Sequence, residues 1–146
     1  MIPQFGSLSG YLPKRKHHAT WDEVVQALGF TPERVALLDG LLAACRNLKA
    51  AGVTEVWLDG SFTTKKKKPS DYDGCYSMTG VDPNTLDPVF LKMRPPRDEM
   101  KKKYKGELLP AEFAADALGT PYSEYFQSDK NGRKKGIVVL NLATLP

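Results

Sequence analysis

The stretch Leu58-Asp59-Gly60-Ser61-Phe62, followed after a lysine-rich loop by Asp71-Tyr72-Asp73, decides the fold of this chain. The apolar run that leads into it favours a strand ending in a Gly-Ser turn, because glycine has no Cβ and permits a sharp change of direction. If Tyr72 lies in a second strand, Asp71 and Asp73 point to the same face, roughly 7 Å apart along the strand. Two carboxylates held side by side repel each other unless a cation lies between them. The stretch therefore predicts a cation site beside a tight turn.

The composition indicates a globular protein of one domain. The length of 146 residues allows a core of its own, and the 41% hydrophobic and 26% charged content is ordinary for such a domain. No apolar run approaches the ~18 residues that a membrane span needs, and the first residues lack the pattern of a secretory signal. Cys45 and Cys75 are too few and too isolated for a disulfide framework or a zinc site. We therefore expect a cytoplasmic protein with no membrane contact.

The basic residues are clustered, and the chain has a formal net charge of +4. The clusters are Lys14 to Lys16, Lys65 to Lys68, Lys101 to Lys103, and Arg133 to Lys135. Such clusters suit an anionic partner, such as a nucleoside triphosphate or RNA, although lysine runs are also common on solvated loops. The run at Lys65 lies inside the loop that joins the two halves of the motif. We therefore expect Lys65 and Lys66 to contact substrate phosphates.

Two helices are expected before the motif. Thr20 and Glu23 have the spacing of a capping box, and the helix that they open should end at Gly29. Thr31 is the expected N-cap of a second helix, with proline in its first position and an apolar stripe at helical spacing. Gly52 stands where a left-handed helix end belongs.

The rest of the chain alternates strands and short helices. Strands are expected at residues 54–59, 72–78 and 136–142. Short helices are expected at residues 86–93, 98–104 and 112–118. Thr120-Pro121 fits the start of a helix through Phe126, but residues 122–127 equally fit a strand, and residues 129–132 predict a turn. This order predicts an α+β fold with a small mixed sheet flanked by helices. We expect a single domain over residues 20–146, preceded by an extended N-terminal arm at residues 1–19.

The motif has the parts of a nucleotide–metal site. Ser61 offers a hydroxyl and a backbone N–H at the expected start of a short helix, a position that suits phosphate. Asp71 and Asp73 offer oxygen ligands to Mg²⁺ (or Mn²⁺), which takes its other ligands from water and substrate phosphates. Lys65 and Lys66 would offset phosphate charge. Together these groups would bind a nucleoside triphosphate and align its α-phosphate for in-line attack.

These residues also carry a family resemblance. Gly60-Ser61 after one strand and Asp71-Tyr72-Asp73 on the next resemble the signature of the DNA polymerase β-like nucleotidyltransferase superfamily. Further segments resemble a small bacterial family of uncharacterised nucleotidyltransferase-like proteins: Ala19 to Glu23, Trp57 to Phe62, Tyr104 to Leu108, Phe126-Gln127, and Lys135 to Val138. The resemblance implies a minimal nucleotidyltransferase core. It also implies nucleotide binding at Gly60, Ser61, Lys65 and Lys66, with Asp71 and Asp73 as catalytic metal ligands.

The superfamily also has a third carboxylate on a later strand. The natural place here is the last expected strand, where Leu140-Asn141-Leu142 presents an amide in an apolar-acid-apolar pattern. Asn141 adds no negative charge and makes a poor base, which weakens the case for catalysis but not for triphosphate binding. Glu107, Glu112 or Asp116 would then have to supply the missing carboxylate, and the sequence does not choose among them.

The resemblance implies a Mg²⁺-dependent transfer of a nucleoside monophosphate, from ATP or another triphosphate, to a hydroxyl of RNA (tRNA) or protein. Small members of the superfamily are often partnered in toxin–antitoxin or phage-defence pairs, which implies a partner protein encoded nearby. The alternative is a catalytically degenerate fold that acts as a nucleotide-, RNA- or protein-binding module. A third hypothesis is a basic RNA-binding domain in which Tyr104, Tyr122 and Tyr125 stack on bases, although packing is the commoner role of such rings.

Overall fold

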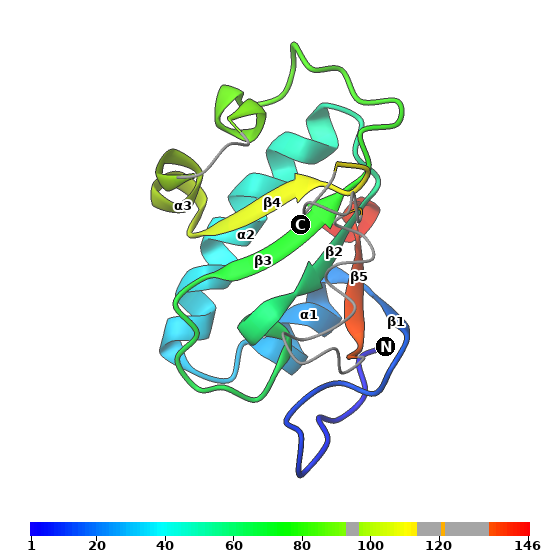
Figure 1. The fold of residues 1–146 in the computed structure, drawn as a ribbon, viewed down its shortest axis with the longest axis vertical. Coiled ribbons are helices and arrows are strands. Elements are labelled where there is room, and N and C mark those ends of the chain that lie inside the picture. The colour runs from blue at the N-terminus through cyan, green and yellow to red at the C-terminus, as the bar shows by residue number, and fades with distance from the viewer. Residues whose placement is uncertain (93–96, 114–120, 122–134) are drawn as a thin grey trace.

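The chain has an α+β fold built on one mixed, five-stranded sheet (Figure 1). The computed structural model describes residues 1–92, 97–113, 121 and 135–146. The strands are β1 (Lys16–Ala19), β2 (Glu55–Asp59), β3 (Tyr72–Tyr76), β4 (Gly106–Pro110) and β5 (Ile137–Asn141). The α-helices are α1 (Trp21–Leu28), α2 (Pro32–Ala50) and α3 (Asp98–Tyr104). The predicted fold class, a small mixed sheet flanked by helices, is confirmed.

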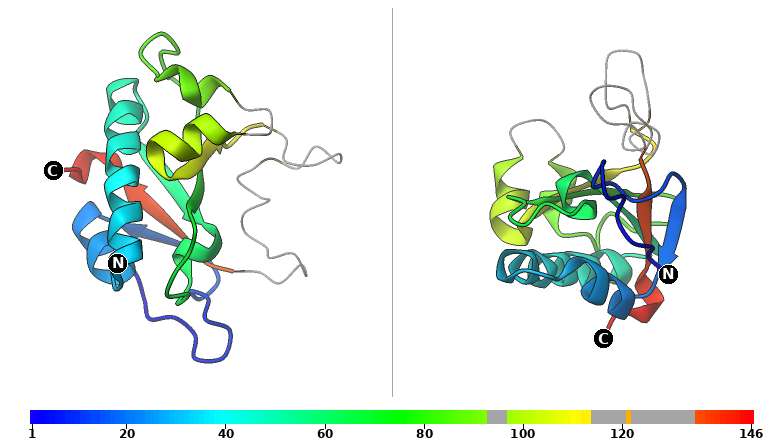
Figure 2. Two further views of the ribbon diagram at one scale, coloured as in Figure 1. Left: turned by 90° about the vertical axis from the view of Figure 1, so that its left-hand side faces the viewer. Right: turned by 90° about the horizontal axis from the view of Figure 1, so that it is seen from below.

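The strands lie in the order β1-β5-β2-β3-β4. The two outer pairs, β1 with β5 and β3 with β4, are parallel, and the two inner pairs, β5 with β2 and β2 with β3, are antiparallel. The helices α1 and α2 lie against one face of the sheet (Figure 2). The sheet therefore has one face that builds the core and a second face that these helices do not cover.

Local sequence signals start both long helices as predicted. Thr20 accepts a hydrogen bond from the backbone N–H of Glu23, whose carboxylate accepts one from the backbone N–H of Thr20, so the capping box is formed. Gly29 is the C-cap of α1, and Thr31 caps α2 through its side chain. Gly52, just beyond the end of α2, has a φ of +108°, which is the left-handed backbone expected there.

Two strands were not predicted. β1 occupies the last four residues of the expected extended arm, at residues 16–19, and β4 was not expected at all. Both are edge strands that pair with a partner distant in the sequence. Neither β1 nor β4 has a clear strand pattern in its own sequence. Each becomes a strand by pairing with β5 or β3, respectively.

The remaining expectations have mixed outcomes. The helix at residues 98–104 is α3, as predicted. The helix expected at residues 86–93 is a short 3-10 turn, η2 (Pro88–Leu91). The turn that follows β2 is η1 (Gly60–Thr63), and η3 (Leu142–Thr144) follows β5. The helix expected at residues 112–118 lies mostly outside the described residues, and the expectations at 122–127 and 129–132 lie wholly outside them.

The register decides what each face of the sheet presents, because side chains alternate along a strand. On the helix side, residues such as Val56, Leu58, Tyr72, Leu108 and Leu140 join the hydrophobic core with α1 and α2. The intervening residues point to the opposite face, and several of them are acidic.

Within the described ranges, no helix is both long and apolar enough to cross a membrane.

Candidate functional site

Three carboxylates lie in one row across the face of the sheet that α1 and α2 leave uncovered. Asp59 at the end of β2 is the cross-strand partner of Asp73 on β3, and Asp73 is in turn the partner of Glu107 on β4. Directly opposed residues on neighbouring strands have Cβ atoms about 4.5–5.5 Å apart, so their side chains interact. Asp71, two residues before Asp73, adds a fourth carboxylate close enough to act on it. The sheet thus gathers acids from three strands.

Asp73 is the centre of this acidic row. Burial, followed by the charges of Asp71, Glu107 and Asp59, raises the pKa of its carboxyl to about 7, against the opposing effect of the Lys101 charge. Repulsion among neighbouring carboxylates and loss of hydration both favour the protonated form. The negative charges around Asp73 therefore outweigh the effect of Lys101, and a cation bound beside Asp73 would relieve the repulsion.

Basic side chains hold the acids on either side of Asp73. The Nζ of Lys101, on α3, lies 3.5 Å from Oδ2 of Asp71 and 3.1 Å from Oε1 of Glu107. Arg97 donates from Nε to Oε2 of Glu107 at 2.9 Å. The Glu107 carboxylate raises the pKa of Lys101 above its usual value. An ammonium group therefore already bridges two of the acids.

Asp59 has a different counter-charge. Its carboxylate is almost fully buried, and the Nζ of Lys135 lies 3.2 Å from its Oδ1. Burial raises the pKa of Asp59 to about 6, against the opposing effect of the Lys135 charge. Asp59 therefore belongs to the acidic row, although the motif of Asp71 and Asp73 did not indicate it.

The Gly-Ser turn lies directly beside Asp73. Gly60 has a φ of +73°, in the left-handed region that glycine favours. A Cβ at this position would come within 2.6 Å of Oδ2 of Asp73. The structure thus brings Gly60, Asp71 and Asp73 together, as the motif predicted, and Ser61 follows in η1.

The two predicted phosphate-contacting lysines have different surroundings. Nζ of Lys65 donates to the backbone carbonyl of Ser7 at 2.8 Å, so this ammonium is held by the N-terminal arm. The carbonyl of Lys66 accepts a hydrogen bond from Nε of Arg34 at 3.0 Å, which fixes the backbone of the loop there. Both lysines are exposed and lie on the loop that follows the Gly-Ser turn.

Of the two described residues considered for the additional carboxylate, Glu107 and Glu112, Glu107 lies next to Asp73. Glu112 accepts hydrogen bonds from Oγ of Ser77 and from the backbone N–H of Met78, just past the opposite end of β3. Asp116 lies outside the described residues. The signal that would have selected Glu107 is the short run Glu107-Leu108-Leu109 between a glycine and a proline, which has an acid beside apolar residues at strand length.

The expectation that Asn141 takes the position of the third acid is wrong. β5 lies between β1 and β2, and Asn141 pairs with Glu55 at the end of β2 that is opposite to Asp59. Its Oδ1 accepts a hydrogen bond from the backbone N–H of Ala143 and so caps η3. An amide at this position therefore says nothing about the carboxylate row.

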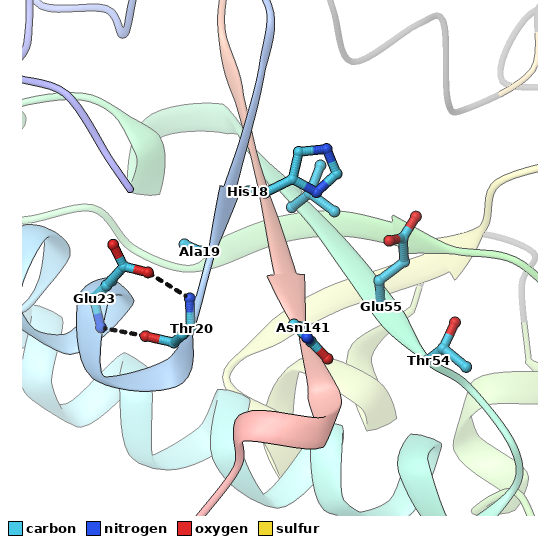
Figure 3. A pocket seen from close by; sticks show the side chains of 8 residues that line it. His18, Ala19, Thr20, Glu23, Thr54, Glu55 and Asn141 are labelled. Atoms are coloured by element: carbon cyan, nitrogen blue, oxygen red, sulfur yellow. Dashed lines mark hydrogen bonds between the residues drawn. The ribbon is translucent and has the colours of Figure 1, made fainter.

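Asn141 instead lines an open hollow of about 350 Å³. Figure 3 shows the side chains of His18, Glu55 and Asn141 around it, with Thr20 and Glu23 to one side. The hollow lies at the far end of β2 from the carboxylate row, so it is separate from the predicted site.

Of the tyrosines considered as base-stacking residues, Tyr104 is buried. Its hydroxyl donates to Oδ2 of Asp87, and its ring stacks on Phe90 with centroids 5.1 Å apart. Tyr122 and Tyr125 lie outside the described residues. The packing role of Tyr104 is confirmed.

The donor chemistry of the row suits Mg²⁺ or Mn²⁺, because carboxylate oxygens are the protein ligands that these ions take. As they stand, no three His, Cys, Asp or Glu side chains of the described residues converge as a ready-made metal site. A divalent ion at Asp71 and Glu107 would have to displace the Lys101 ammonium that bridges them.

Comparison with known proteins yields one family. No curated protein and no solved structure matches the chain significantly. Residues 3–141 match a family described as a family of unknown function, DUF6932. This match spans nearly the whole chain, including every strand of the sheet and the carboxylate row. The chain therefore belongs to the DUF6932 family.

Proposed function

We propose that the protein is a Mg²⁺- or Mn²⁺-dependent nucleotidyltransferase that transfers a nucleoside monophosphate from a nucleoside triphosphate to a hydroxyl of RNA or protein. The observation that supports it best is the row Asp59, Asp73 and Glu107 beside the turn at Gly60. The resemblance to the DNA polymerase β-like nucleotidyltransferases implies the same arrangement, with acids on neighbouring strands beside a Gly-Ser turn. The proposal includes a cytoplasmic location and a partner protein encoded nearby.

The residues divide into two groups by chemistry. Asp71, Asp73 and Glu107 would hold the divalent ion, which supplies charge neutralisation at the transferred phosphate when bound. The turn at Gly60 and Ser61 and the lysines that follow it would bind the other phosphates.

Transfer of label from nucleoside triphosphates labelled at the α-phosphate tests the activity. The assay contains Mg²⁺ or Mn²⁺ with bulk tRNA or cell lysate as the acceptor source. Label transfer by the wild type and its loss in Asp71→Ala/Asp73→Ala are expected. Glu107→Gln, which keeps the shape of the side chain, should lower transfer at least 10-fold, whereas Glu112→Gln should leave it within about twofold. Transfer that survives the double substitution would exclude catalysis by this pair.

A second function, a nucleotide-binding module without turnover, is favoured by the Lys101 bridge. Lys101 neutralises Asp71 and Glu107 from within the chain, so the fold is complete without a metal. Thermal-shift titration separates the two functions. Stabilisation by a Mg²⁺–triphosphate without label transfer favours the module, while stabilisation with transfer favours the enzyme.

A further inference from the structure

Arg34 is a buried cation in the first turn of α2. Its side chain is 0% exposed. Among the described residues, no carboxylate forms an ion pair with it. Burial of a charge without a counter-charge is costly, and a cation near the start of a helix is opposed by the helix dipole. The position therefore requires strong compensation.

Backbone carbonyls provide this compensation. A guanidinium group has five N–H donors, and the hydrogen bonds of Arg34 account for all of them. The acceptors are the carbonyl oxygens of Lys66 (3.0 Å from Nε), Phe62 (2.7 Å from Nη1), Leu28 (3.1 Å from Nη1), Ser61 (3.3 Å from Nη2) and Thr64 (from Nη2). Four of these five carbonyls belong to residues 60–68, the first part of the loop between β2 and β3, which we call the phosphate loop.

Other contacts fix the same loop. Oγ1 of Thr31, the cap residue of α2, donates to the carbonyl of Lys67 at 2.8 Å. The backbone N–H of Lys65 donates to the carbonyl of Gly10 at 3.1 Å. The start of α2 and the N-terminal arm therefore hold the phosphate loop from two sides, with Arg34 at its centre.

The guanidinium orients the peptide units of the loop. In a trans peptide the C=O and the N–H point in opposite directions. Carbonyls drawn toward Arg34 therefore turn the N–H groups of the next residues away from it. Arg34 thus fixes the orientation of the peptide units that follow the Gly-Ser turn.

Two aromatic rings flank the guanidinium. Its central carbon lies 4.2 Å from the ring centroid of Phe30 and 5.2 Å from that of Phe62. An apolar side chain here would leave the carbonyls without their donors, which is costly. Burial lowers the pKa of Arg34 to about 10, so the group keeps its proton at neutral pH. A permanent positive charge thus lies beneath the Gly-Ser turn.

We propose that Arg34 is a positioning residue that fixes the phosphate loop and adds the positive charge by which this loop binds the triphosphate of the substrate. This inference rests on the proposed function, because it assigns the substrate's triphosphate to the same site. It goes further by naming a residue that the Gly-Ser and Asp-x-Asp motif does not contain and that acts through the loop backbone.

Binding of inorganic tripolyphosphate, measured by isothermal titration calorimetry with and without Mg²⁺, tests the inference. Arg34→Lys keeps the charge but loses the planar fork, and Arg34→Met loses both. Leu48→Ala, in the buried part of α2 at its other end, is the control for lost stability. We expect affinity to fall at least 10-fold in both Arg34 variants and to stay within about twofold in Leu48→Ala. Trypsin cleavage after Lys65, Lys66 or Lys67 should also be faster in Arg34→Lys than in Leu48→Ala.

The outcomes separate this inference from the proposed function. Arg34 variants that bind tripolyphosphate as the wild type does would overturn the inference and leave the proposed function standing. A wild type that binds neither tripolyphosphate nor any Mg²⁺–nucleoside triphosphate would overturn both. If circular dichroism shows that the Arg34 variants are unfolded, Thr31→Val takes their place, since it removes the hydroxyl that holds Lys67. A drop of at least threefold then supports the inference, and unchanged affinity overturns it.

Discussion

At the scale of single residues, Asp73 is the side chain whose protonation the fold affects most clearly. Its pKa of about 7 lies above the ordinary value of 3.8, as does the pKa of Asp59 at about 6. Between pH 3.8 and about 7, the Asp73 carboxyl is therefore protonated to a greater extent in the folded state than in the unfolded state. It follows that the contribution of Asp73 to stability becomes less favourable as pH rises from about 4 to about 7.

The substitution Asp73→Asn should therefore raise the free energy of unfolding, relative to the wild type, more at pH 8 than at pH 5. Each pKa unit corresponds to about 1.4 kcal/mol, so the gain between the two pH values should be roughly 2–4 kcal/mol. Urea denaturation at both pH values measures it. Asp39→Asn, at an exposed position of α2, is the control and should show no such difference. A gain for Asp73→Asn that is equal at pH 5 and pH 8 would contradict the explanation.

Gly60 offers a second test at this scale. An alanine there is strained by its φ of +73° and brings its Cβ within 2.6 Å of Oδ2 of Asp73. Gly80 has nearly the same φ, +75°, but a Cβ there meets no atom within 4 Å. We expect Gly80→Ala to cost about 1 kcal/mol of unfolding free energy and Gly60→Ala at least about 2 kcal/mol, because only Gly60 adds a steric clash. Equal losses in urea denaturation would show that the contact with Asp73 does not matter.

At the scale of elements, α3 places a cation against the acids of β3 and β4. Lys101→Met removes the ammonium from between Asp71 and Glu107 and leaves their repulsion uncompensated. We expect the melting temperature at pH 8 to fall without divalent ions and to rise more steeply with added Mg²⁺ or Mn²⁺ than in the wild type. Thermal-shift titration measures both effects. Lys102→Met, at an exposed neighbouring position of α3, should behave as the wild type does. An unchanged Mg²⁺ response in Lys101→Met would mean that the bridge does not compete with metal.

The elements also show what the sequence could predict. The caps at Thr20 and Thr31 are local, because the donor and acceptor lie within one turn of helix, and both helices were predicted with their ends. β1 is short and polar, and it becomes a strand only because β5, far along the chain, pairs with it. Such a pairing leaves no periodic signal in the segment itself.

The candidate site divides in the same way. Gly60, Asp71 and Asp73 lie close in sequence, so their meeting could be predicted from one motif. The addition of Glu107 depends on the parallel pairing of β3 with β4, and no spacing rule fixes such a pairing. The prediction at Asn141 failed because it also depended on strand pairing. It assumed that residue 141 of β5 would lie beside the acids, whereas Asn141 pairs with Glu55 at the other end of β2.

At the scale of the whole molecule, β1 protects the edge of β5. Deletion of residues 1–19 should leave the β5 edge without its partner and free the backbone groups that β1 now pairs. An unpaired strand edge promotes association between chains. We expect size-exclusion chromatography to show self-association of the deletion variant, and circular dichroism to show a lower melting temperature. Deletion of residues 1–4, which leaves β1 in place, is the control, and a monomeric, equally stable 1–19 deletion would contradict the prediction.

The strand order has a consequence for how the chain folds. Of the described strands, β5 comes latest in the sequence, yet it lies inside the sheet, between β1 and β2. The pairing of β1 with β5 joins residues about 120 positions apart, and contacts so distant in sequence form slowly, because a long loop must close first. A nascent chain can complete both helices and the β2–β3 hairpin early, but the sheet waits for residues 137–141. Until β5 is available, the edge of β2 lies open, and a chain in that state is prone to associate with other chains.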